Sequence, residues 1–68
     1  MKTFNYAIWR EGKHYVSLCL NNDVSSFGES REEALVNLKE ALELYYEDST
    51  GEYTSIAELS VGEELIDA

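Results

Sequence analysis

The sequence predicts a small α+β domain of order β-β-β-α-β, in which an antiparallel sheet has one helix packed on one face. Three observations lead to this fold class. Residues 3–10 and 13–20 alternate between a mainly apolar set and a half-polar set of side chains, as strands do. Residues 31–48 repeat apolar side chains every three or four positions, as amphipathic helices do. A chain of 68 residues has room for one domain, so residues 1–68 form a single unit.

The first two strands, over 3–10 and 13–20, are expected to form a hairpin. Arg10, Glu11 and Gly12 suit a three-residue loop in which Gly12 is left-handed. Such a loop pairs Trp9 with Lys13. We prefer it to a two-residue loop because it gathers the apolar side chains of both strands on one face. That predicted core face comprises Phe4, Tyr6, Ile8, His14, Val16 and Leu18.

The opposite face of the predicted hairpin is half polar. In the chosen register, two large aromatic side chains, Trp9 and Tyr15, lie on it near the hairpin end. Aromatic residues are enriched where proteins bind one another. This face is therefore a candidate docking surface.

The turn-forming residues 21–23 precede a short third strand, which is expected over 24–28 and ends at a glycine. The helix follows at once. Ser30 and Glu33 have the spacing of a capping box, in which the two side chains satisfy two backbone N–H groups of the first turn.

The helix over 31–48 is expected to end at Ser49, Thr50 and Gly51, with Gly51 in the left-handed cap position. Residues 53–61 are interpreted as a fourth strand. Residues 62–68 are interpreted as a frayed tail.

The helix has an apolar side and an acidic side. The apolar stripe, which is expected to cover the sheet, comprises Ala34, Leu35, Leu38, Ala41, Leu42 and Tyr45. Glu32, Glu33, Glu40, Glu43 and Glu47 lie on the opposite side, around Val36. Such a side is typical of an ordinary solvated helix, but an apolar spot ringed by carboxylates also suits a basic protein partner. The candidate partner-binding residues are therefore Trp9, Tyr15, Val36, Glu33, Glu40, Glu43 and Glu47.

The composition favours a protein partner over nucleic acid or membrane. Fourteen Asp and Glu against five Lys and Arg give a formal charge of −9, which repels phosphate and speeds encounter with a basic protein. No apolar run approaches the roughly 20 residues that a bilayer requires, and the N-terminus lacks the features of a secretory signal. We therefore expect a cytoplasmic protein. Because the single Cys19 cannot form an internal disulfide, self-association is the expected support for so small a core.

The residue types argue against catalysis. One histidine, His14, and one cysteine, Cys19, are too few for a zinc site or for a nucleophile with its base. The four glycines are scattered, so they form no phosphate-binding loop. The first two strands contain no Asp or Glu, whereas a two-metal nuclease needs converging carboxylates on rigid elements. We expect no enzymatic activity, no metal and no cofactor.

The order of these motifs resembles the family of HicB-like antitoxins. The resemblance lies in the run Gly28, Glu29, Ser30, Arg31, Glu32, Glu33, Ala34 and Leu35, followed by Leu38, Lys39, Glu40, Ala41, Leu42 and Tyr45. With the preceding hairpin it covers residues 3–48. The resemblance implies a partial RNase H-like fold that has lost nuclease chemistry. It also implies a role in binding and neutralising a small basic mRNA-cleaving toxin of the HicA type.

Two features depart from that family. Members commonly have a proline in the loop before the third strand, whereas residues 20–24 contain none. Members often add a C-terminal DNA-binding segment, and the residues after Val61 are too few and too acidic for one. Repression of its own operon is therefore not expected.

Two alternatives stay open. The small core and the predicted exposure of Trp9 and Tyr15 would also suit an orphan scaffold or regulatory domain, a homodimer or higher homo-oligomer without a toxin partner. An active nuclease is less favoured, because the strands lack convergent carboxylates.

Overall fold

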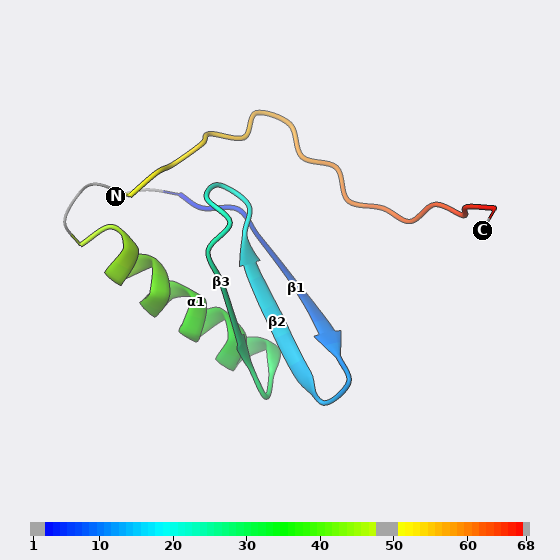
Figure 1. Cartoon of the computed structure of the whole chain (residues 1–68), viewed down its shortest axis with the longest axis horizontal. Coiled ribbons are helices and arrows are strands. Elements are labelled where there is room, and N and C mark those ends of the chain that lie inside the picture. The colour runs from blue at the N-terminus through cyan, green and yellow to red at the C-terminus, as the bar shows by residue number, and fades with distance from the viewer. Residues whose placement is uncertain (1–2, 48–50, 68) are drawn as a thin grey trace.

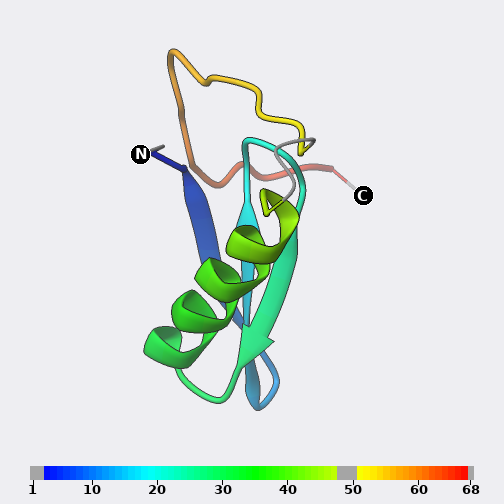
Figure 2. The ribbon, with the colours of Figure 1, turned by 90° about the vertical axis from the view of Figure 1, so that its left-hand side faces the viewer.

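A computed structural model of the protein describes residues 3–47 and 51–67. A three-stranded antiparallel sheet in the order β1-β2-β3 is followed by one helix that covers one face of the sheet (Figures 1 and 2). The strands are β1 (Tyr6–Glu11), β2 (His14–Cys19) and β3 (Ser25–Gly28), and the helix is α1 (Arg31–Tyr45). These elements confirm the predicted α+β class and its β-β-β-α order.

The hairpin between β1 and β2 has a two-residue loop, Gly12 and Lys13. Trp9 pairs with Val16, and Glu11 pairs with His14. Gly12 has a φ of 60° and Lys13 has a negative φ, which is the pattern of a type II′ turn. The predicted three-residue loop and the pairing of Trp9 with Lys13 are therefore wrong. The register differs by an odd number of residues, so the side chains of β2 lie on the opposite face from the one predicted.

The sheet face under α1 therefore differs from the predicted core face. Ser17 lies directly opposite Ile8, so the two side chains share a face. The Ser17 hydroxyl donates to the carbonyl of Ala34 at 2.8 Å, which identifies this face as the one that α1 covers. Ile8 is thus placed as predicted. Three residues that were predicted to join it, His14, Val16 and Leu18, lie on the face away from the helix.

The core between α1 and the sheet is small. Its buried apolar side chains are Cys19, Ala34, Leu38 and Leu42. Phe4, Val24 and Tyr46 pack around them. The three helical members of the core belong to the predicted apolar stripe, which is confirmed. Burial of each leucine contributes about 1.5–3 kcal/mol to stability.

The start of α1 agrees with the predicted capping box, with a shift on one side. Ser30 is the N-cap, and its hydroxyl accepts a hydrogen bond from the Glu33 N–H at 3.1 Å. The Glu33 carboxylate accepts from the N–H of Glu29 at 2.7 Å, one residue earlier than the usual box. Both side chains still satisfy a backbone donor.

The end of α1 comes earlier than predicted. Tyr46 is the C-cap, and its N–H donates to the carbonyl of Leu42 at 3.0 Å. Gly51 is therefore not the cap, and the glycine instead lies against the ring of Tyr45, where an added Cβ would meet ring carbons at 2.8 Å. The predicted end at residue 48, with Ser49 and Thr50, lies outside the described residues.

Residues 51–67 contain no strand, so the predicted fourth strand over 53–61 is wrong. Part of this segment bonds to the β2–β3 turn: the Thr54 N–H donates to the Asn21 carbonyl at 2.9 Å, and the Asn21 amide donates to the Thr54 carbonyl at 2.8 Å. Beyond this anchor the chain runs away from the sheet (Figure 1). We call residues 57–67 the C-terminal arm.

The arm gives the molecule an extended shape. The radius of gyration of the whole molecule is 13.6 Å, whereas a compact chain of this length has about 11 Å. Within the described residues, α1 is neither long nor apolar enough to cross a membrane.

Candidate protein-interaction surfaces

The outer side of α1 carries carboxylates around two exposed apolar side chains. We call this surface the acidic helix face, and it comprises Glu33, Val36, Glu40, Glu43, Leu44 and Glu47. Val36 is 53% exposed and Leu44 is 71% exposed, although both are apolar. Glu40 lies four residues from each of them, so the three side chains follow one side of the helix over two turns.

Leu44 is a surface residue that the sequence reasoning missed. The apolar stripe was assigned from the buried positions, and Leu44 belongs to neither the stripe nor the set of acids. Its spacing of eight residues from Val36 was the available signal, because this spacing returns to the same side of a helix. With Leu44 included, the apolar part of the acidic helix face extends along two turns.

Within α1 the acidic helix face has one countercharge at helical spacing, Lys39, which lies four residues before Glu43 in the less favourable order. The last turn of the helix contains no basic residue. Glu43 and Glu47 are separated by four residues, a spacing at which like charges repel. They also lie near the C-terminal end of α1, where the helix dipole disfavours negative charge. A cationic partner would relieve both effects.

Glu33 also has a structural role. Its carboxylate accepts a hydrogen bond from the Glu29 N–H. This bond holds the chain at the start of α1, where the helix dipole favours negative charge. Glu33 therefore differs from Glu43 and Glu47, which are exposed acids with no such bond among the described contacts.

Trp9 and Tyr15, which were predicted to share one docking face, lie on opposite faces of the sheet. Trp9 points away from α1 and is 38% exposed, and its indole N–H donates to Glu11 at 2.8 Å. Tyr15 lies on the helix side, where the guanidinium of Arg31 lies 5.4 Å from the centre of its ring. The prediction that the two aromatic side chains form one patch is therefore wrong, because the predicted register placed Tyr15 on the sheet face away from α1.

The face of the sheet away from α1 is largely apolar and, in the part of the chain that the structure describes, has no helix or strand packed on it. We call it the open sheet face, and it comprises Ala7, Trp9, Glu11, His14, Val16, Leu18 and Phe27. Phe27 is 65% exposed, and its ring meets His14 edge to face at 6.3 Å between centres. Sequence reasoning missed Phe27, because a four-residue strand does not reveal which of its sides is covered.

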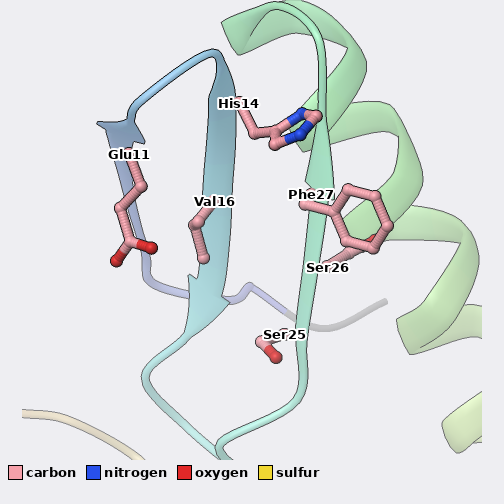
Figure 3. A pocket seen from close by; sticks show the side chains of 6 residues that line it. All are labelled: Glu11, His14, Val16, Ser25, Ser26 and Phe27. Carbon is pink, nitrogen blue, oxygen red and sulfur yellow. The ribbon is translucent and has the colours of Figure 1, made fainter.

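The open sheet face contains a shallow hollow of about 430 Å³ (Figure 3). It is lined by Glu11, His14, Val16, Ser25, Ser26 and Phe27. Figure 3 shows the side chains of Glu11, His14, Val16 and Phe27 on the side of the sheet away from the helix. The hollow has the size and the partly apolar lining that admit an aliphatic side chain.

The residues considered for catalysis or metal binding do not come together. His14 and Cys19 are at opposite ends of β2 and on opposite faces, and Cys19 is buried in the core. Within residues 3–47 and 51–67, no group of three His, Cys, Asp or Glu side chains is placed to hold a metal ion.

Comparison with known proteins adds no relative to this description. No protein-family model, no curated protein and no solved structure matches the chain.

Proposed function

We propose that the protein is a non-catalytic binding module of the HicB-like antitoxin type, which neutralises a small basic mRNA-cleaving toxin of the HicA type. The observation that carries the proposal is the acidic helix face, where Val36 and Leu44 are exposed between carboxylates. The sequence resemblance supplies the class of partner. The β-β-β-α order is compatible with it.

The mechanism is electrostatic and steric masking. A protein that cleaves mRNA holds the phosphate backbone with Lys and Arg side chains. The carboxylates of the acidic helix face take the place of those phosphates, and the charge of −9 speeds the encounter. Val36 and Leu44 add apolar burial, as exposed side chains of a helix do when it docks in a groove.

α1 is held firmly enough to present this face without rearrangement. Leu38 and Leu42 are buried beneath it. Two hydrogen bonds tie the helix to neighbouring strands: the Ser17 hydroxyl donates to the Ala34 carbonyl, and the Asn37 amide donates to the Phe27 carbonyl, both at 2.8 Å. A surface that is already ordered loses less entropy on binding.

The experiment is co-expression with a HicA-type toxin, taken from a short basic reading frame beside the gene. The wild-type chain should restore growth. Replacing both apolar residues, Val36→Lys with Leu44→Lys, should abolish rescue and weaken binding to a catalytically inactive form of the toxin by at least about 100-fold, which corresponds to two lost hot-spot contacts. Glu58→Lys, an exposed charge reversal on the C-terminal arm, is the control and should still rescue.

A toxin that is neither bound nor neutralised by the wild-type chain would refute the proposal. Rescue that survives the double change at Val36 and Leu44 would refute the assignment of the acidic helix face.

A second candidate is a homo-oligomeric scaffold without a toxin partner. The uncovered open sheet face, with Trp9 and Phe27, favours it. A chain that assembles with itself and ignores every basic ribonuclease offered to it would be of this kind.

A further inference from the structure

Apart from the acidic helix face, two apolar surfaces have nothing packed on them among residues 3–47 and 51–67, and they belong to different parts of the molecule. One is the open sheet face, where Phe27 is 65% exposed. The other is the C-terminal arm, whose exposed apolar side chains are Leu59, Val61, Leu65 and Ile66. Leu65 is fully exposed, at 101%. An exposed apolar patch of this extent marks an interaction site.

The arm has the length and pattern of a segment that lies along a sheet. Extended chain advances about 3.3 Å per residue, so residues 57–67 span roughly 36 Å, against about 20 Å for the six residues of β2. Leu59, Val61 and Leu65 are separated by even numbers of residues. An extended arm therefore presents all three side chains to the same surface.

The arm is acidic, whereas the end of the sheet at which β1 turns into β2 is basic. The arm carries Glu58, Glu63, Glu64 and Asp67, and no Lys or Arg. Arg10 and Lys13, by contrast, lie at the hairpin end of the sheet. Arg31 is at the same end, since its guanidinium lies over Tyr15, the strand partner of Arg10. Both arginines are therefore on the helix side of that end, whereas Lys13 lies in the turn between the two faces. Three of the five Lys and Arg of the chain are thus gathered at one end of a strongly acidic protein.

We propose that the C-terminal arm of one chain lies across the open sheet face of a second copy, and that the arm of the second copy lies across the open sheet face of the first. The aliphatic side chains of the arm enter the hollow beside Phe27, and its acidic tip lies at the hairpin end, near Lys13. This goes beyond the proposed function, because it uses neither α1 nor a toxin.

The occupant is a second copy because the arm runs away from its own sheet after the anchor at Thr54 (Figure 1). A specific interface of this kind needs to bury roughly 1,200–2,000 Å² in total, counted over both copies. The exchange also explains how a chain with four fully or almost fully buried apolar residues gains further support.

Sedimentation velocity of the full-length chain at micromolar concentration tests the assembly. The wild type, of 7.7 kDa per chain, should sediment as a dimer. Val61→Glu combined with Leu65→Glu in the arm should give monomers, and so should Phe27→Glu on the sheet. Leu44→Glu, an equally exposed apolar position on the acidic helix face, is the matched control and should stay dimeric.

Crosslinking identifies the occupant. A chain with Phe27→Cys, mixed with a chain with Leu65→Cys and oxidised, should give a disulfide-linked heterodimer. Cys19 is completely buried and takes no part. If both changes in one chain close the disulfide within that chain at high dilution, the arm covers its own sheet and the proposal is overturned.

Two further results would overturn it: a monomeric wild type, and a dimer that persists in both the arm and the Phe27 variants. The control separates this inference from the proposed function. Leu44→Glu should impair toxin binding and leave the dimer intact, whereas Phe27→Glu should do the reverse.

Discussion

Gly28 lies so close to Ala34 that a Cβ atom on the glycine would be 2.6 Å from the Ala34 backbone nitrogen. β3 thus runs against the first turn of α1 with no room for a side chain. The same turn receives the hydrogen bond from the Ser17 hydroxyl to the Ala34 carbonyl. Gly28 therefore permits the close approach of sheet and helix on which the orientation of the acidic helix face depends.

The variant Gly28→Ala should lower the free energy of unfolding by about 1–3 kcal/mol, the usual cost of forcing extra atoms into a packed site. The obstacle here is backbone, which cannot turn aside as a side chain can. Urea unfolding followed by circular dichroism measures the loss. Gly62→Ala is the control, because nothing lies within 4 Å of its added Cβ, and its midpoint should match the wild type. Equal midpoints for both variants would show that β3 and the first turn of α1 have room for a side chain at residue 28.

Replacing Asn21 should also lower the stability of the fold. It is 2% exposed, and its side-chain oxygen accepts from the Asn5 N–H at 2.7 Å while its amide donates to the Thr54 carbonyl at 2.8 Å. Asn21→Ala leaves the Asn5 N–H and the Thr54 carbonyl without their side-chain partner. Each of these groups that stays buried should lower the free energy of unfolding by about 1–3 kcal/mol. Thermal unfolding should show a clear fall in midpoint, and the backbone of residues 51–56 should exchange hydrogen faster. Asn37→Ala, which removes one exposed bond, should cost less.

Charge reversal at the two ends of α1 should have opposite effects on stability. Glu43→Lys places a cation in the last turn, where the helix dipole favours it, so stability should rise by about 0.3–1 kcal/mol. Glu33→Lys removes the carboxylate that accepts from the Glu29 N–H and places a cation in the first turn, so stability should fall by about 1 kcal/mol. Both variants change the net charge equally. The same direction of change in both would contradict the dipole argument.

Glu43→Lys also separates stability from function. If the acidic helix face binds a basic toxin, this variant should be more stable and yet bind more weakly. Isothermal titration against a catalytically inactive toxin, beside the unfolding measurement, reports both quantities. Affinity that rises together with stability would remove Glu43 from the contact surface.

Periodicity predicted the elements that pack locally. The stripe through Leu38 and Leu42 and the cap at Ser30 follow from spacing within one helix, and both are present. The hairpin register was wrong for a physical reason. Gly12 suits the last position of a three-residue loop and also the first position of a type II′ turn. The choice was made by gathering apolar side chains on one face, whereas this sheet has apolar side chains on both.

The prediction of a fourth strand was wrong because a long-range contact holds this segment in another way. The backbone at Thr54 bonds to Asn21 in the β2–β3 turn, a partner that no local pattern specifies. The predicted strand over 53–61 rested on local spacing, in which Ile56 and Leu59 fall on opposite sides of a period of two. The prediction that Trp9 is exposed was correct, because its place on β1 did not depend on the loop. Tyr15 was misplaced with the rest of β2.

Trp9 provides a direct optical test of whether the open sheet face is covered in solution. It is the only tryptophan of the chain, and it is 38% exposed on that face. If an arm from a second copy lies across the face, Trp9 is shielded from water in the dimer and hydrated in the monomer. Its emission maximum should therefore shift to the red on dilution through the dissociation constant.

The variant Leu65→Glu combined with Val61→Glu should show the red-shifted emission at every concentration, since its arm cannot pack on apolar side chains. Leu44→Glu, on the far side of α1, should follow the wild-type dilution curve. Emission that stays constant over a thousand-fold dilution in the wild type, at the position seen in the arm variant, would mean that the open sheet face remains uncovered.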